Sequence, residues 1–275
     1  MICNLKNLLH VLPPWLSSQL EHDSIESLQE LRLRLDQPPE LIFPGNRQFL
    51  HQRVRQEDLT FCINTARRYS PWAAVSAADG YLTIPGGHRI GICGEAIFKN
   101  GQAAGMRTIH SLCIRIARDF PGLAERMGGI SGSVLILGAP GWGKTTLLRD
   151  LIRQRAQKET VAVVDERGEL FPEGFARGNQ TDVLTGCPKS RGILQLLRTM
   201  GPQTIAVDEI TSPQDCSAIL EAFGCGVSLL ATAHSGSLRQ FSERPVYGSL
   251  IENRVFENVL ILQEDQTSQV ERMAI

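Results

Sequence analysis

The feature that most constrains this chain is the segment VLILGAPGWGKTTLLRD, residues 134–150. It joins an apolar run, a turn of the pattern Gly-x-x-x-x-Gly-Lys-[Ser/Thr] and a leucine-rich stretch. Glycines let the backbone N–H groups of such a turn point inward, and a following helix presents the positive end of its dipole. The segment therefore predicts a strand, a phosphate-binding loop and a helix, with a nucleotide held at the loop.

The residue types of the loop indicate how the nucleotide is held. We expect the Lys144 ammonium to reach the β and γ phosphates and the Thr145 hydroxyl to ligate Mg2+. No motif that would read the base is visible, so the loop alone does not separate ATP from GTP. The predicted binding residues are Gly138, Ala139, Pro140, Gly141, Trp142, Gly143, Lys144, Thr145 and Thr146.

Acidic and imidazole side chains follow three other buried-type strands. TIAVDEI ends on Asp208, which we expect to orient the water shell of Mg2+, and on Glu209, which could polarise an attacking water. VVDERGEL carries Asp165 and Glu166, and LLATAHSG carries His234. The carboxyl ends of parallel strands meet at one edge of a sheet, so we expect these residues near the loop. Spacing leaves open which acid of VVDERGEL faces the nucleotide.

The arrangement of apolar runs divides the chain into two parts. From residue 126 to 275, buried strands alternate with helices, which predicts a three-layer α/β core with FENVLILQ as its last strand. Residues 1–125 predict a smaller α+β domain with an antiparallel sheet that glycines interrupt. There, LQELRLRLD alternates like a half-buried strand, residues 56–78 have a helical pattern, and Asn100-Gly101 marks a hairpin.

Charge and hydropathy exclude several classes of protein. The 275 residues carry a formal net charge of −1, which argues against a stable nucleic-acid partner held by electrostatics. No stretch approaches the roughly 18 apolar residues that span a bilayer, and MICNLKNLLHVLPPWL lacks the features of a secretory signal, so no direct membrane insertion is expected. Seven scattered cysteines predict buried free thiols in a reducing compartment.

Several segments together resemble a known family. GYLTIPGGHRIGICGEAIFKNGQ, CIRIAR, GAPGWGKTTLLRD, VAVVDERGEL, TDVLTGCPK, LLRTMGPQTIAVDEI and ATAHSGS occur in the order typical of the stage III sporulation protein AA family, over roughly residues 25–262. That family is similar to secretion and pilus-retraction ATPases. The resemblance implies a RecA-like P-loop NTPase core that uses ATP and Mg2+. It implies that Asp165 and Glu166 lie in an acidic box, Asp208 and Glu209 in the Walker B segment, and His234 in a histidine box.

The same resemblance implies partners and a location. It implies a homo-oligomer, as a hexamer, in the cytoplasm of the mother cell, held at the membrane by integral-membrane components of the stage III sporulation complex. In such motors a neighbouring arginine can offset charge on the γ phosphate. Arg89, Arg107, Arg115 and Arg198 are candidates, and Arg89 is preferred because flanking glycines would allow a close approach. The predicted catalytic residues are Lys144, Glu209, His234, Glu166, Arg89 and Arg198.

The chain departs from the family pattern at two residues. Trp142 replaces a residue that is usually small, and Thr211 replaces a common glycine. Neither change removes a phosphate or metal ligand. The Trp142 ring either occupies an outward-facing position that tolerates size, or packs against an adjoining subunit or shields the phosphates.

Three functions are compatible with these observations. The leading hypothesis is an oligomeric ATPase that performs conformational work on a membrane-bound export or channel complex. The first alternative is a RecA-like ATPase acting on single-stranded nucleic acid. The sequence up to Ile275 contains no added basic domain, which argues against this alternative. The second is a nucleotide-gated scaffold in which Trp142 makes hydrolysis negligible.

Overall fold

The computed structural model describes residues 5–22, 27–68, 80–99, 102–127, 129–263 and 268–272. The chain divides into two compact units, Met1–Asp119 with Pro172–Phe175, and Phe120–Phe171 with Ala176–Ile275. A search of the described ranges for a helix long and apolar enough to cross a membrane finds none. That residues 1–125 and 126–275 form separate domains stays a prediction.

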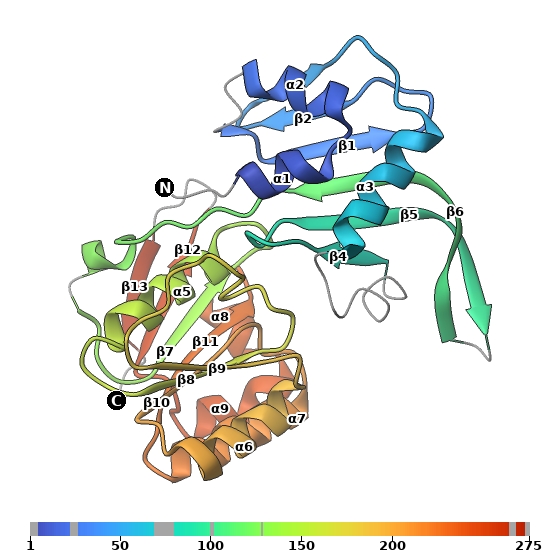
Figure 1. Ribbon diagram of the computed structural model, residues 1–275. Coiled ribbons are helices and arrows are strands. Elements are labelled where there is room, and N and C mark those ends of the chain that lie inside the picture. The colour runs from blue at the N-terminus through green and yellow to red at the C-terminus, as the bar shows by residue number, and fades with distance from the viewer. Residues whose placement is uncertain are drawn as a thin grey trace. The chain divides into compact units, whose positions relative to one another are not determined.

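The first unit is built on an antiparallel sheet (Figure 1). Its elements are α1 (Leu5–Val11), α2 (Pro14–His22), β1 (Glu30–Arg34), β2 (Glu40–Phe43), β3 (Asn46–Phe49), α3 (Gln56–Arg68), β4 (Tyr81–Thr83), β5 (Arg89–Lys99) and β6 (Gln102–Arg115). The strand order is β3-β2-β1-β6-β5-β4. The antiparallel sheet predicted for this part of the chain is confirmed.

Alternation along the strands forms the core of this unit. Leu31 and Leu33 of β1 are fully buried and pack with Leu59 and Ile63 of α3, because every second side chain of a strand points to the same face. The predicted helix over 56–78 begins at Gln56, and α3 ends at Arg68; the remainder of that range lies outside the described residues. The predicted hairpin residues, 100 and 101, also lie outside them, and the flanking β5 and β6 pair antiparallel.

A short piece of the later sequence belongs to the first unit. The Gly86 N–H donates to the Glu173 carbonyl oxygen at 3.1 Å. Gly87 has a φ of +77°, and a Cβ atom there would lie 2.4 Å from Pro172 Cγ, so this contact requires glycine. The chain therefore leaves the second unit after Phe171, contributes Pro172–Phe175 to the first, and returns at Ala176.

The second unit contains a mostly parallel sheet. Its elements are η2 (Ala124–Met127), β7 (Val134–Gly138), α5 (Lys144–Arg155), β8 (Val161–Asp165), β9 (Thr181–Thr185), α6 (Lys189–Met200), β10 (Thr204–Val207), α7 (Pro213–Gly224), β11 (Ser228–His234), α8 (Leu238–Ser242), η3 (Pro245–Tyr247), α9 (Gly248–Glu252), β12 (Asn258–Leu262) and β13 (Ser268–Arg272). The strand order is β13-β12-β7-β11-β10-β8-β9, and the β12–β13 pair alone is antiparallel among these neighbours.

One prediction about this sheet is wrong. FENVLILQ contains β12, but β13 follows it and pairs antiparallel along the edge of the sheet. The sequence of β13, SQVER, contains one apolar residue in five, so no apolar run marks it as a strand. An edge strand buries little surface and does not need such a run.

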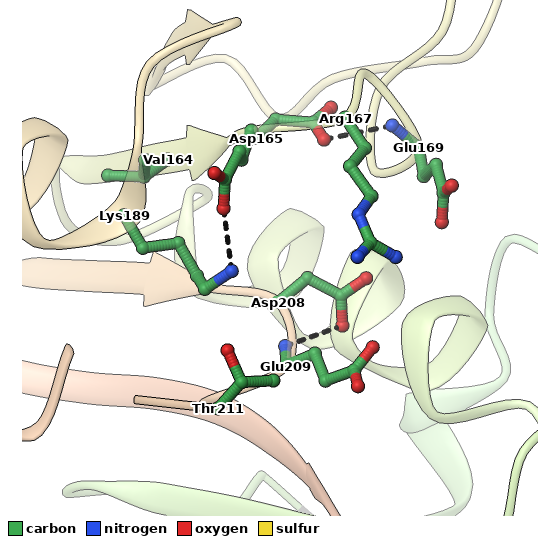
Figure 2. A pocket seen from close by; sticks show the side chains of 9 residues that line it. Val164, Asp165, Arg167, Glu169, Lys189, Asp208, Glu209 and Thr211 are labelled. Atoms are coloured by element: carbon green, nitrogen blue, oxygen red, sulfur yellow. Dashed lines mark hydrogen bonds and ion pairs between the residues drawn. The ribbon is translucent and has the colours of Figure 1, made fainter. Parts of the chain in front are cut away.

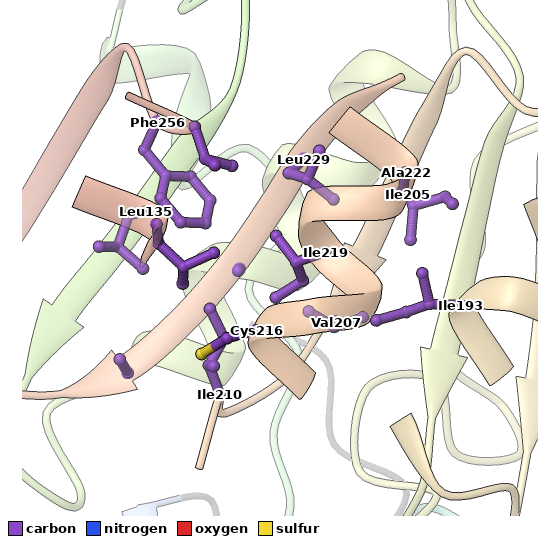
Figure 3. Close-up of a cluster of buried hydrophobic side chains, with 14 of the residues drawn as sticks. Leu135, Ile193, Ile205, Val207, Ile210, Cys216, Ile219, Ala222, Leu229 and Phe256 are labelled. Atoms are coloured by element: carbon purple, nitrogen blue, oxygen red, sulfur yellow. The ribbon is translucent and has the colours of Figure 1, made fainter. Parts of the chain in front are cut away.

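Apolar side chains cover both faces of the parallel sheet. Leu135 and Leu137 of β7 belong to a buried cluster with residues of α6 and α7 (Figure 3). Val134 and Ile136 of the same strand pack with α5 on the opposite face. A sheet buried on both faces gives the near-continuous apolar strands seen in the sequence. The predicted three-layer α/β core is confirmed.

Helix α6 lies unusually close to the sheet. At Gly192, an added Cβ would lie 2.6 Å from Val164 Cγ1 of β8, shorter than side chains tolerate. The missing side chain therefore allows α6 to approach β8. This approach brings the first residue of the helix, Lys189, beside the peptide that follows β8.

Candidate nucleotide-binding site

The glycine-rich loop joins the end of β7 to the start of α5. Gly141 and Gly143 have φ angles of +81° and +91°, which residues with a side chain rarely adopt. Gly143 precedes α5 and offers its first N–H groups no side-chain cap. Uncapped N–H groups at a helix start, with the positive end of the helix dipole, favour an anion. The local geometry therefore suits a phosphate.

The lysine of the loop is turned inward. Lys144 is 6% exposed, and its Nζ donates to the Ala139 carbonyl oxygen at 2.9 Å. Burial lowers the pKa of Lys144, while the carboxylates of Asp208 and Glu209 act in the opposite direction. The ammonium is thus a buried charge, and the groups in contact with it are the Ala139 carbonyl oxygen and the His234 ring rather than a carboxylate. A phosphate would compensate this charge better than a carbonyl oxygen does.

His234 lies between the lysine and the candidate base. Its Nδ1 is 2.8 Å from Lys144 Nζ, and its Nε2 is 3.1 Å from Glu209 Oε1. A lysine ammonium only donates, so Nδ1 accepts and the ring proton lies on Nε2, where it donates to Glu209. Nδ1 is also 3.4 Å from the Gly138 carbonyl oxygen, a longer contact that this tautomer leaves unused. The three predicted residues form one continuous chain of contacts.

The Walker B aspartate contacts the loop directly. The Thr145 hydroxyl donates to Asp208 Oδ2 at 3.0 Å, and the Thr232 hydroxyl donates to Oδ1 at 2.7 Å. A hydroxyl beside a carboxylate is a donor set that suits Mg2+, which takes further oxygens from water and phosphate. Across the described ranges, no cluster of three or more His, Cys, Asp or Glu could hold a metal alone. Thr145 and Asp208 would therefore hold Mg2+ together with phosphate oxygens.

Asp165, the last residue of β8, and Glu166, which follows it, have different surroundings. Asp165 is 2% exposed, and its carboxylate accepts the backbone N–H groups of Glu169, Leu170 and Phe171 at 2.8 to 3.1 Å. Burial raises the pKa of Asp165, and these three hydrogen bonds oppose that shift. The Asp165 carboxylate thus shapes the loop after β8.

Glu166 lines a small cavity, around which Figure 2 shows Lys189, Asp208 and Glu209. Its Oε2 accepts a hydrogen bond from Lys189 Nζ at 2.7 Å. Asp208, Glu209 and Thr211 line the same cavity from the next strand of the sheet. Asp165 and Glu169 line this cavity as well, but the Asp165 carboxylate is bound by three backbone N–H groups, whereas the Glu166 carboxylate is bound by the Lys189 ammonium.

The two departures from the family pattern have structural partners. Trp142 is half-buried and packs against the apolar cluster between the sheet and α5. Part of the ring therefore packs inside this unit, and both interpretations, a position that tolerates size and a role toward the phosphates or a second subunit, stay predictions. The Thr211 N–H and hydroxyl donate to Asp215 Oδ2 at 3.2 and 3.3 Å, which ties the end of the Walker B segment to α7.

The candidate arginines all have partners in their own unit. In the first unit, the Arg89 guanidinium lies 3.9 Å from the centroid of the Tyr81 ring, Arg107 pairs with Glu95, and Arg115 pairs with Glu30. In the second unit, Arg198 lies 3.8 Å from Glu221. That any of them acts across a subunit boundary stays a prediction.

Comparison with known proteins identifies the family. The family model described as "Sporulation stage III, protein AA" matches residues 6–272. The chain belongs to the stage III sporulation protein AA family. Stage III sporulation protein AA of Bacillus subtilis (strain 168) is 36% identical to this chain over 264 residues, which are 89% of this chain and 85% of that protein. Protein SEEDLING PLASTID DEVELOPMENT 1 of Arabidopsis thaliana is 28% identical, and the match covers 88% of this chain but 35% of that protein.

Solved structures show the fold that this family member shares. The pilus retraction motor PilT, solved with bound ADP, aligns with a TM-score of 0.64 and 12% identity, over 92% of this chain and 80% of that one. The ATPase DotB of Legionella pneumophila aligns with a TM-score of 0.57 and 20% identity, over 95% and 80% of the two chains. The predicted RecA-like P-loop fold is confirmed.

One residue of the site was not predicted. Lys189 lies 23 residues after Glu166 in the sequence, and only the packing of α6 against β8 joins the two side chains. The sequence signal was its position directly after Pro188, where a helix can begin. A lysine at a helix start is unfavourable for the helix dipole, which is a hint that another contact fixes it there.

Proposed function

We propose that this member of the stage III sporulation protein AA family binds and hydrolyses ATP with Mg2+, as an oligomeric motor. The observation that carries the proposal is the joining of the loop and the Walker B segment through the Thr145 to Asp208 hydrogen bond of 3.0 Å. This contact joins the two residues that would hold Mg2+. The ADP bound to the similarly folded PilT supports nucleotide as the ligand.

The proposed roles follow the contacts of each side chain. Lys144 neutralises the β and γ phosphates, and Glu209 accepts the proton of the attacking water. His234, which contacts both of them, would report the presence of the γ phosphate to Glu209. Phosphate binding draws Lys144 away from Nδ1 of the imidazole. Because the same ring donates to Glu209, phosphate binding at Lys144 and the position of Glu209 are linked through His234.

The oligomer and its partners are further parts of the proposal. DotB is described as an ATPase and PilT as a pilus retraction motor, and the family is named for stage III of sporulation. We propose a hexamer on the cytoplasmic side of the mother-cell membrane that drives the stage III export or channel complex. Arg89 or Arg198 of one subunit would offset charge at the nucleotide of the next.

The test measures ATPase rate against protein concentration for the wild type, Lys144→Ala and Glu209→Gln. We expect a cooperative rise with concentration in the wild type and a loss of at least about 100-fold in both variants. Lys144→Ala removes the cation that neutralises the phosphates, and Glu209→Gln removes the base that accepts the water proton. Arg89→Ala should keep nucleotide affinity and lower turnover.

Matched controls and added DNA separate the alternatives. Lys158→Ala and Glu252→Gln remove the same charges at exposed positions and should leave the rate unchanged. Turnover that depends on single-stranded DNA would favour the nucleic-acid ATPase. Nucleotide binding without turnover at any concentration would contradict the motor and favour the scaffold.

A further inference from the structure

Lys189 is the first residue of α6 and is largely buried, with 12% of its side chain exposed. Its Nζ lies 2.7 Å from Glu166 Oε2. Placing a lysine at the positive end of a helix and burying it are both unfavourable unless a carboxylate compensates the charge. The pair is therefore a fixed contact of the fold, and it determines where the Glu166 carboxylate points.

Glu166, whose carboxylate Lys189 binds, lines a cavity of about 30 Å3. The other charged residues that line it are Asp165, Arg167, Glu169, Lys189, Asp208 and Glu209 (Figure 2). A buried water needs about 10–15 Å3 of such volume and two to four polar partners. The cavity thus has room for about two waters and more hydrogen-bonding groups than they require.

Charge explains why the position of Glu166 needs a cation. Five acidic side chains line this small space, against the two cations Lys189 and Arg167. The Asp165 carboxylate is compensated by the three backbone N–H groups that it accepts. Like charges around so small a space repel one another, and a carboxylate without a compensating charge would turn toward bulk solvent. Lys189 supplies that charge to Glu166 through the 2.7 Å contact and so keeps Glu166 beside the cavity.

We propose that Lys189 is a positioning residue for hydrolysis, which holds Glu166 so that one water is bound between the Glu166 and Glu209 carboxylates. This inference rests on the proposed ATPase function. The water donates one hydrogen bond to each carboxylate and directs a lone pair at the γ phosphorus. As its oxygen bonds to phosphorus, the bond to the β,γ-bridging oxygen breaks, ADP leaves with that oxygen, and the proton passes to Glu209.

The first test removes the charge of Lys189 and keeps its length. In Lys189→Met we expect kcat to fall by about 10- to 100-fold, since water positioning is lost. The KM for ATP and the Kd for ADP should stay within about twofold, because Lys189 does not line the phosphate loop. Lys189→Arg should recover much of kcat. Arg191→Ala, an exposed cation on the same helix turn, is the matched control and should behave as wild type.

A charge exchange separates positioning from mere stabilisation. The double variant Glu166→Lys with Lys189→Glu rebuilds an ion pair but puts an ammonium where the Glu166 carboxylate would bind the water. We expect its urea midpoint to lie closer to that of the wild type than the midpoint of Lys189→Met does. Its kcat should stay as low as that of Lys189→Met. Recovery of kcat together with the midpoint would overturn the inference, because a purely structural pair would behave in that way.

Failure of the inference and failure of the proposed function give different results. If the wild type turns over ATP and Lys189→Met has the same kcat, the positioning role alone is overturned. If neither protein hydrolyses ATP, the proposed function is overturned and the inference with it. A fall in kcat that accompanies an equal weakening of ADP binding would also overturn it, since Lys189 would then act on nucleotide affinity.

Discussion

Glu209 combines a proposed catalytic role with an unfavourable backbone conformation. Its φ is +38°, in a region that residues with a side chain rarely occupy. Its N–H donates to both Asp208 Oδ1 at 3.0 Å and the Thr232 hydroxyl at 2.8 Å, and these two acceptors hold the peptide in this position. Such strained residues concentrate at functional sites, where the surroundings enforce the conformation.

The strain at Glu209 predicts an order of stability between two variants. Both Glu209→Gly and Glu209→Ala lose the carboxylate, but glycine adopts a positive φ without a steric cost. We expect the glycine variant to be more stable to urea by about 1 kcal/mol. Glu221 in α7 is the control, because in a helix the alanine variant should be the more stable one. Equal stability of the two Glu209 variants would contradict the strain.

At the scale of elements, the approach of α6 to β8 determines the position of Lys189. The approach depends on the absence of a side chain at Gly192, which faces Val164. A methyl group there has to displace the helix or the strand, since protein interiors are closely packed. The position of a charged side chain in the site therefore depends on a steric fit in the core behind it.

This dependence predicts a rescue by a second substitution. Gly192→Ala should lower the free energy of unfolding by about 1–3 kcal/mol through overpacking. Val164→Ala removes the methyl groups that the new side chain meets, so the double variant should lose less than the sum of the two single variants. A urea-unfolding double-mutant cycle measures this coupling. Additive losses would show that α6 does not press on β8 at Gly192.

The strands that are buried appear in the sequence as apolar runs and were predicted. Elements without an apolar run or a regular apolar spacing were missed. Strands β7, β8, β10 and β11 are fully or almost fully buried, so they were visible as apolar runs. The edge strands β9 and β13 have no such run and were missed, as were the short helices α1 and α2 around Pro13 and Pro14. Contacts within motifs were likewise predictable, whereas the Glu166 to Lys189 pair required the packing of a helix on a strand.

At the scale of the whole molecule, each unit has a buried thiol that reports its integrity. Burial raises the pKa of Cys62 to about 12 and that of Cys216 to about 11. The thiolate is the reactive form, so near neutral pH both side chains are protected from modification by their burial and by their raised pKa. All six cysteines of the described residues are free thiols, but Cys93 and Cys225 are exposed. The prediction that the cysteines are buried is thus confirmed for Cys62 and Cys216 and wrong for these two.

Thiol labelling should therefore follow the opening of each unit separately. At pH 8, iodoacetamide should modify Cys93 and Cys225 rapidly and spare Cys62 and Cys216 until denaturant opens the unit that contains them. Peptide mass spectrometry along a urea series gives the midpoint for each residue. Fully denatured protein, in which all sites react, is the control. Modification of Cys62 as fast as Cys93 without urea would contradict the burial of the first core.

The return of the chain through Pro172–Phe175 has a mechanical consequence. The peptide that carries Glu166 is anchored to the second unit by the Asp165 hydrogen bonds, and it continues directly into residues that are fastened to the first unit by Gly86 and Gly87. Because the bonds to Asp165 hold residues 169–171, no unanchored residue lies between that contact and Pro172. A pull on Pro172–Phe175 would therefore act first on the Asp165 hydrogen bonds, and the loop that carries Glu166 would move only once they break.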